Sequence, residues 1–254
     1  MMIDLNSDMG ESYGAYTIGA DDEVLRWVTS ANVACGWHGG DPSVMRRTVD
    51  RAKASGVAVG AHPSYPDLLG FGRRVMLIPR QEARDYILYQ IGALRAFAEA
   101  LGVRLQHVKP HGAIYNAAVK DRELSLGIAE GIADAGGNLI LVGLPGSELL
   151  RAGQEVGVRV AREAFGDRAY NEDGTLVSRK LPGSLITDPG AVAERVLGFT
   201  RGTVTAITGT EIRIQVDTIC LHGDTPGAGA IARRVREGME ASGVKPRPMG
   251  EFIA

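Results

Sequence analysis

The sequence predicts an α/β protein whose strands are mainly parallel. Short β-rich runs alternate with longer helical patterns along all 254 residues, an alternation typical of βαβ units. Four of the five histidines lie at the ends of predicted strands, each beside a turn residue. No linker, low-complexity segment, charge block or internal repeat divides the chain. We therefore expect one domain over residues 1–254, long enough for one α/β barrel.

Seven segments have the pattern of strands, and the first alternates most clearly. Ile3 and Leu5 should face the helices, whereas Asp4, Asn6 and Asp8 share the opposite parity and should face the interior. In a parallel α/β protein the carboxyl ends of all strands meet at one rim, where ligands bind. The predicted strands are Ile3–Asn6, Ala31–Cys35, Val57–His62, Gln106–Lys109, Leu139–Val142, Val158–Glu163 and Val216–His222.

Helical patterns lie between the strands, and the clearest runs from about Pro79 to Leu101. One apolar stripe follows this segment at helical spacing. Three other helices should start where a capping side chain precedes a proline, and glycines mark several helix ends. The stripe is Ile87, Ile91, Leu94, Ala98 and Leu101; the starts are Asp41-Pro42, Asp188-Pro189 and Thr225-Pro226; the ends are Gly56, Gly102 and Gly136-Gly137.

Two connections are too long for plain loops between a strand and a helix. One runs from His62 to Ile78 and the other from Glu163 to Asp188, where Asp173-Gly174 predicts a small hairpin. Long loops inside a compact domain are usually functional or disordered. Both follow strand ends, so we expect them beside the same rim.

Composition excludes several classes of function. The chain has 28 basic and 30 acidic residues, a net charge of −2, so we expect no nucleic-acid partner. No stretch approaches the ~20 uninterrupted apolar residues of a membrane span. The chain reaches Asp4 after three residues, so no secretory signal is expected. Cys35 and Cys220 are its two cysteines, which suits buried thiols in a reducing cytoplasm.

The turn after the first strand carries two carboxylates. Asp8 and Glu11 follow Asn6 in the run NSDMGE, which suits a general acid or base or a metal ligand; the alternative is an Asx-turn that only shapes the loop. His62 ends a run of small residues that would leave space around it. A ligand or acid–base role for His62 and a structural role are equally supported.

Further candidates follow other strands. Lys109 and His111 bracket Pro110. Lys109 could hold an anion or polarise a carbonyl; the alternative is a plain surface lysine. His38 lies among glycines, which permit close approach to a ligand. His222 precedes Gly223 and Asp224, at a helix start that could bind an anion or simply pack tightly. By contrast, Asp41 is better explained as a helix cap, and His107 as a core histidine within its strand.

Several common motifs are absent. The chain has no GxxxxGK[ST], GxGxxG, GxSxG or HExxH sequence. Any metal site must therefore be assembled from separate strands.

Six blocks of the chain, in order, resemble the LamB/YcsF family. They are LNSDMGESYG, SANVACGWHGGDP, GAHPSYPDLLGFGRR, VKPHGAIYN, EAFGDRAYNEDGTLVSR and HGDTPGA. The resemblance implies a seven-stranded irregular (β/α) barrel of the glycoside hydrolase/deacetylase type. It also implies hydrolysis of the lactam of 5-oxo-L-proline to L-glutamate, with ATP, expected with Mg²⁺, converted to ADP and phosphate. The partners it implies are two further subunits, B and C.

A lactam is a stable amide, so a site for this reaction needs a base for water, cations for carboxylate and phosphate, and donors to the developing oxyanion. Asp8 or Glu11 could be the base. The predicted catalytic residues are Asp8, Glu11, His62, Lys109 and His111; the predicted substrate-binding residues are Asn6, Asn32, His38, Arg73, Arg74, Arg179, His222 and Asp224.

Two other functions stay open from the sequence. One is a stand-alone metal-dependent amidase or deacetylase, in which Asp8, His62 and His111 hold a divalent ion. The other is a non-catalytic ligand-binding subunit. The predicted arginines also have an alternative role, since some of them could tie the long loops down through Asp67 or Asp167.

Overall fold

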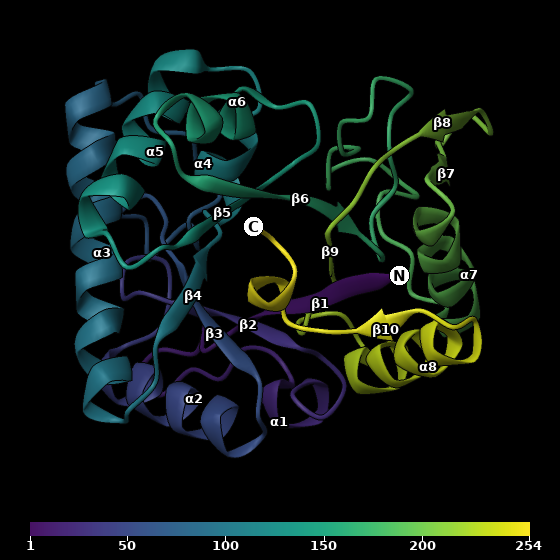
Figure 1. Ribbon diagram of the computed structural model, residues 1–254, viewed down its shortest axis with the longest axis horizontal. Helices are drawn as coiled ribbons and strands as arrows, with labels where there is room; N and C mark the ends of the chain where they lie inside the picture. Colours follow the sequence, from purple (N-terminus) through teal and green to yellow (C-terminus); the bar gives the residue numbers. More distant parts are fainter.

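A closed barrel of parallel strands forms the centre of the molecule, as Figure 1 shows. The computed structural model describes residues 1–254. Each barrel strand pairs in parallel with its neighbours, and the first and last strands pair with each other to close the ring. The predicted seven-stranded barrel is therefore confirmed. Its strands are β1 (Met2–Met9), β2 (Ser30–Ala34), β3 (Ala58–His62), β4 (Leu105–Val108), β5 (Ile140–Gly143), β6 (Arg159–Phe165) and β9 (Thr218–Cys220).

Alternation along β1 separates an apolar layer from a polar interior, as predicted. Ile3 and Leu5 are fully buried in the main hydrophobic cluster that the helices share. Asp4 and Asn6 are also fully buried, but they hydrogen-bond to side chains of other barrel strands. The barrel interior is thus lined with polar groups that satisfy one another.

Helices surround the barrel, with α3 and α5 packed together on one side and α7 and α8 on the other (Figure 1). Four members of the predicted stripe, Ile87, Ile91, Leu94 and Ala98, are inaccessible to solvent in α3, whereas Leu101 follows the helix and is partly buried. Each buried Ile or Leu contributes about 1.5–3 kcal/mol relative to an exposed one. The helices are α1 (Asp21–Val24), α2 (Pro42–Ala54), α3 (Arg80–Ala100), α4 (Gly112–Ala117), α5 (Arg122–Ala135), α6 (Glu148–Glu155), α7 (Pro189–Thr200) and α8 (Ala228–Ala241).

Two of the three predicted helix starts are confirmed and one is wrong. The Asp41 and Asp188 carboxylates accept backbone N–H bonds at the first turns of α2 and α7. Thr225, however, does not cap α8, which begins at Ala228 after Gly227 in a left-handed conformation. The Thr225 hydroxyl instead donates to the Asp167 carboxylate, 3.2 Å away. A loop contact therefore takes the side chain that the sequence assigned to the helix.

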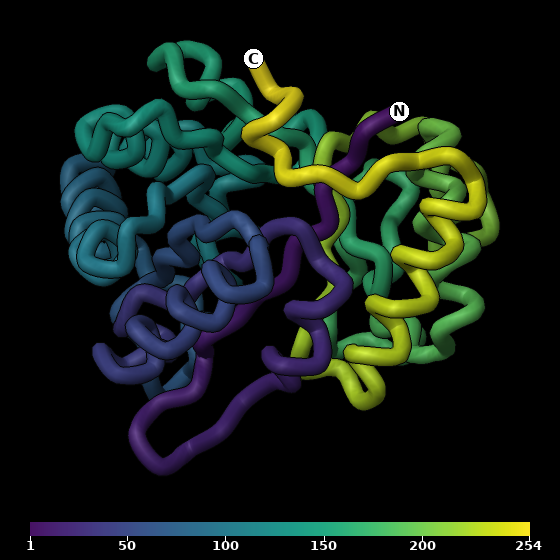
Figure 2. The backbone as a smooth tube through the Cα atoms, turned by 60° about the horizontal axis from the view of Figure 1, so that its bottom comes forward, coloured from purple at the N-terminus to yellow at the C-terminus, as the bar shows by residue number.

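The amino end of the barrel is closed by the end of the chain. Strand β10 (Lys245–Pro246) pairs with β1, and the 3₁₀ helix η1 (Met249–Glu251) places Met249 against Ile140 of β5. Figure 2 shows both termini at this end, while the segment between β1 and α1 projects at the other.

No helix is long and apolar enough to cross a membrane.

The second long loop contains isolated β-bridges rather than strands. The predicted hairpin is present as one bridge between Tyr170 and Leu176 rather than as named strands. A separate antiparallel pair, β7 (Thr203–Thr205) with β8 (Glu211–Arg213), lies outside the barrel. Both long loops contribute residues to the carboxyl rim.

Candidate active site

A cavity of about 750 Å³ opens at the carboxyl end of the strands. All five predicted catalytic residues line it together from the carboxyl ends of β1, β3 and β4 and the turns that follow: Asp8, Glu11, His62, Lys109 and His111. His222 and Asp224 line the same cavity, as do Arg73 and Arg179 from the long loops. The predicted gathering at one cavity is confirmed for these residues, although they span more than 200 positions of sequence, but it is wrong for His38, which does not line the cavity.

Lys109 is the cation that lies among the buried carboxylates at the cavity floor. It is 2% exposed, and its Nζ lies 2.8 Å from Asp8 Oδ1 and 3.0 Å from Glu163 Oε1. Burial alone would lower the pKa of Lys109, but Asp8, Cys220 and Glu163 hold it well above its usual range. The ammonium therefore stays charged and can fix the direction of the Asp8 carboxylate.

Asp8 presents an ionised carboxylate to the cavity. Burial would raise the pKa of Asp8, but His62 and Lys109 outweigh it and hold that pKa well below its usual range. Asn32 donates to Asp8 Oδ1 from 2.8 Å, and Asp8 Oδ2 lies 3.4 Å from His62 Nε2. One oxygen is thus held from two sides while the other faces the histidine.

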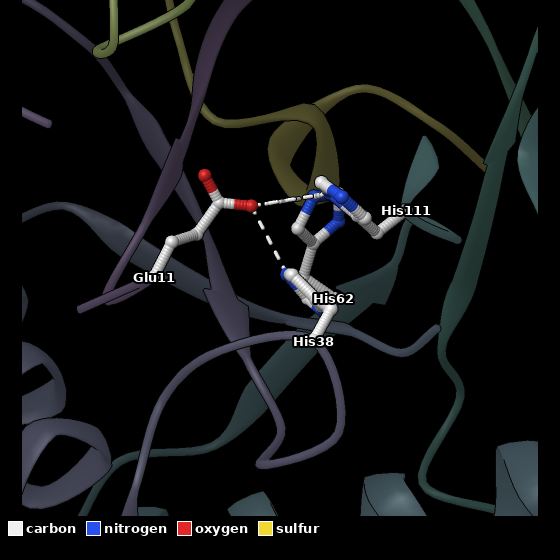
Figure 3. Close-up of side chains that lie close together, drawn as sticks. All are labelled: Glu11, His38, His62 and His111. Atoms are coloured by element: carbon white, nitrogen blue, oxygen red, sulfur yellow. Dashed lines mark hydrogen bonds and ion pairs between the residues drawn. The ribbon is translucent and has the colours of Figure 1, made fainter. Parts of the chain in front are cut away.

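Three histidine rings lie together on one side of the Glu11 carboxylate, as Figure 3 shows. Glu11 Oε1 lies 3.0 Å from His38 Nε2, 3.1 Å from His111 Nδ1 and 3.8 Å from His62 Nε2. Burial would raise the pKa of Glu11, but His111 and His38 hold it far below its usual range. His38 stacks on His111 at 3.8 Å between ring centroids and does not line the cavity. Burial, with His111, lowers the pKa of His38 to about 3.

His222 is oriented by a residue of the second long loop. Its Nδ1 lies 2.8 Å from Asp167 Oδ1, so Nε2 is the nitrogen left for other partners. Burial would raise the pKa of Asp167, but His222 and Arg179 lower it. A ligand atom of His222 also comes within 4.8 Å of Asp8 and Cys220.

The three predicted arginines have different surroundings. Arg73 lines the cavity and pairs with Asp224 at 3.3 Å. Arg74 lies outside the cavity lining and forks onto the buried Asp67 carboxylate through Nε and Nη2. The geometry therefore favours the loop-tying role for Arg74, whereas Arg73 and Arg179 remain placed to meet an anion.

Asn6 and Asn32 lie beneath the cavity rather than in its wall. Both are fully buried, and Asn32 donates to Asn6 Oδ1 from 2.7 Å as well as to Asp8. His107 Nε2 contacts Asn32 Oδ1 at 2.7 Å, consistent with its predicted place in the core. Gly60 makes room for that ring, because a Cβ there would lie 2.2 Å from His107 Nε2. The space left by the small residues before His62 is thus filled by His107.

Comparison with known proteins agrees with this architecture. The model of the LamB/YcsF family matches residues 3–254. This chain belongs to the LamB/YcsF family. It is 57% identical to the A-subunit of 5-oxoprolinase from Pyrococcus furiosus and 58% identical to that from Pyrococcus abyssi, in each case over the full length of both chains.

Solved structures support the fold. The crystal structure of a lactam utilization protein from Thermus thermophilus superposes with a TM-score of 0.92 and 49% identity, covering 97% of this chain and 99% of that one. The Bc1960 peptidoglycan N-acetylglucosamine deacetylase has a TM-score of 0.53 at 11% identity, covering 99% of this chain and 87% of that one. The second likeness concerns the fold alone, and it agrees with the predicted deacetylase-type barrel.

Two residues at the floor of this cavity were assigned no catalytic or binding role from the sequence. Glu163 lies within β6, is fully buried and contacts both Lys109 and Asn6. Cys220 places its Sγ 3.1 Å from Lys109 Nζ, and burial raises the pKa of its thiol well above the usual range. A carboxylate inside a strand-like apolar run is the signal that could have marked Glu163. Cys220 had no such signal, because a buried cysteine usually packs as a small hydrophobe.

The cavity places groups that can transfer protons beside groups that can bind an anion. Asp8 and Glu11 are carboxylates that stay ionised at neutral pH. Lys109 stabilises negative charge from below, and Arg73 and Arg179 lie at the wall. Cations and acid–base groups facing one water-accessible cavity are the parts that acyl transfer needs.

Proposed function

We propose that this chain is the subunit of an ATP-dependent 5-oxoprolinase that carries the lactam-opening site. The relatives named as the A-subunit of 5-oxoprolinase support this assignment. The observation that carries it is the Asp8 carboxylate, fixed by Lys109 and directed into a cavity with arginines at its wall. A volume of about 750 Å³ lies within the range of small-molecule sites and leaves room beside a small lactam for a phosphate group.

In the proposed reaction, ATP is a co-substrate that phosphorylates the amide oxygen, and water then attacks the activated carbon. Asp8 accepts the proton of that water as the new C–O bond forms. It is ionised at neutral pH, as a base must be, although the cations that lower its pKa also reduce its basicity. When the C–N bond breaks, the ring nitrogen takes up a proton from the surrounding acid–base groups, and the carbon is left as an acyl phosphate. A second water then hydrolyses the acyl phosphate to the side-chain carboxylate of glutamate and free phosphate.

Charge at the cavity wall matches the two anionic parts of this substrate. The lactam carries a carboxylate, and activation adds a phosphate. Arg73 and Arg179 supply planar guanidinium groups, which bind either anion through two parallel hydrogen bonds. The chain has no phosphate-binding loop motif, so we propose that it works together with subunits B and C.

The test is an activity assay with and without those partners. Purified chain is incubated with 5-oxo-L-proline, ATP and Mg²⁺, and glutamate and ADP are measured. We expect coupled formation of both products with the two partner subunits and no useful rate with the chain alone. Efficient turnover by the isolated chain would contradict the dependence on partners.

A stand-alone metal-dependent amidase is the second candidate. The observation that favours it is the group of ligand-type atoms from Glu11, His38, His62 and His111, which lie within 4.8 Å of one another. The same assay separates the two candidates, because such an amidase would open a lactam or amide without ATP and without partners.

A further inference from the structure

A cluster at the edge of the cavity has no assigned step in the proposed lactam reaction. It consists of Glu11, His62 and His111. All three side chains are buried and line the same cavity. Their facing atoms lie 3.0 Å apart between His62 Nε2 and His111 Nδ1, 3.1 Å between His111 Nδ1 and Glu11 Oε1, and 3.8 Å between His62 Nε2 and Glu11 Oε1.

Backbone carbonyls decide which nitrogen of each ring faces inward. His62 Nδ1 lies 2.6 Å from the Lys109 carbonyl oxygen, and His111 Nε2 lies 2.9 Å from the Phe71 carbonyl oxygen. A carbonyl oxygen only accepts, so these outer nitrogens carry the hydrogens. In the neutral rings, His62 Nε2 and His111 Nδ1 therefore point lone pairs at each other. Such backbone bonds to the outer nitrogen are typical of metal-binding histidines.

Two facing lone pairs and a carboxylate oxygen need a positive centre between them. The neighbouring ammonium, Lys109, is already bound to Asp8 and Glu163. The separations of 3.0–3.8 Å bracket the roughly 3.3 Å between ligands of a tetrahedral ion with bonds of about 2.0–2.1 Å. Two imidazoles and one carboxylate suit Zn²⁺ and similar transition-metal ions, whereas Mg²⁺ and Ca²⁺ prefer oxygen ligands.

We propose that Glu11 Oε1, His62 Nε2 and His111 Nδ1 form a three-ligand site for a divalent transition-metal ion, with its open position facing the cavity. His38 is a positioning residue: its Nε2 holds Glu11 Oε1 from 3.0 Å, and its ring stacks on His111. Glu11, rather than the predicted Asp8, completes the set, because Glu11 Oε1 faces both His62 Nε2 and His111 Nδ1. Asp8 Oδ1 is held by Lys109 and Asn32, and Asp8 Oδ2 faces His62 Nε2. The site does not depend on the lactam substrate.

Measurements of metal binding test the proposed three-ligand site directly. The full chain is stripped with a chelator and titrated with Zn²⁺ by calorimetry, and metal content is measured by mass spectrometry after gel filtration. We expect one ion per chain. Glu11→Gln and His62→Asn should each weaken binding by on the order of 10²-fold, and His38→Asn by about 10–100-fold, as for residues that orient a ligand. The matched control is His107→Asn, since His107 is buried but outside the group.

Substitution of Co²⁺ gives a readout that does not rely on variants folding. A four-coordinate Co²⁺ site absorbs strongly in the visible range, and the wild-type chain should show this spectrum. A stripped wild-type chain that binds neither ion, with a proton shared by His62 and His111 instead, overturns the proposal. Stoichiometric binding unchanged in folded Glu11→Gln and His62→Asn variants also overturns it. If the stripped chain binds neither ion but supports ATP-dependent turnover with its partners, the metal site is refuted and the proposed function stands.

Discussion

Replacing Lys109 by methionine probes both the stability and the chemistry of the cavity floor. The substitution keeps most of the side-chain volume but removes the ammonium that contacts Asp8 at 2.8 Å and Glu163 at 3.0 Å. Both carboxylates would then share a buried region without their common cation. We expect the folded state to lose stability and the Asp8 carboxylate to lose its fixed direction.

The expected loss of stability follows from the burial of Lys109 and its carboxylate partners. Removing one partner of a buried ion pair costs about 3–5 kcal/mol, because the remaining charge is left uncompensated. For a chain of 254 residues, about 1 kcal/mol shifts the melting temperature by about 2–4 °C. Lys109→Met should therefore lower the Tm by about 6–20 °C. Turnover of the reconstituted complex should fall by about 10²-fold or more if Asp8 is the base.

Thermal unfolding and the coupled assay measure these two effects separately. Adding Glu163→Gln to Lys109→Met should restore part of the stability, since it removes one buried charge, but none of the activity. Lys245→Met is the matched control, because this exposed lysine lies at the amino end of the barrel. A Tm within about 3 °C of wild type, roughly the effect of 1 kcal/mol, together with normal turnover, would refute the reasoning.

Three further predictions concern a buried carboxyl group and two loop arginines. Burial raises the pKa of Asp4 from 3.8 to about 6. Between these two pH values the folded chain keeps a proton that the unfolded chain has lost. The free energy of unfolding should therefore fall by about 3 kcal/mol as the pH rises through this window. Urea unfolding from pH 3.5 to 7 measures this fall, which Asp4→Asn should remove; an unchanged profile in that variant would count against it. Arg74→Lys should lower both Tm and activity, because Arg74 braces the loop through Asp67. Arg179→Lys should reduce turnover at nearly constant Tm, and full activity in this variant would show that Arg179 does not bind the substrate.

The barrel and most of the rim were predictable because local rules and the global fold agree. Alternation along β1 placed Asp4 and Asn6 in the interior, and strand-end positions brought His62, His111 and His222 to one cavity. Parallel strands share a carboxyl end whatever the details of their connections. The residues of the rim could therefore be named before any distance was known.

Contacts between side chains on different strands could not be predicted in the same way. Thr225 looked like a helix cap, but it donates to Asp167, 58 positions earlier in the chain. His38 follows β2 as expected, yet it stacks behind His111 and does not reach the cavity. Glu163 of β6 meets Lys109, which follows β4, only because both side chains point into the barrel interior. The strand register and the closure of the barrel determine which side chains of different strands meet. Neither can be predicted from a local sequence pattern.

The most direct test of the central claim, that this cavity is where the lactam is opened, is to measure turnover and assembly of the same Asp8→Asn complex. The substitution is nearly isosteric, and its amide cannot act as a base. We predict normal assembly with subunits B and C by gel filtration, and conversion of 5-oxo-L-proline reduced by about 10²-fold or more. Normal assembly with near-normal turnover would contradict the claim and favour a chain that only binds ligand.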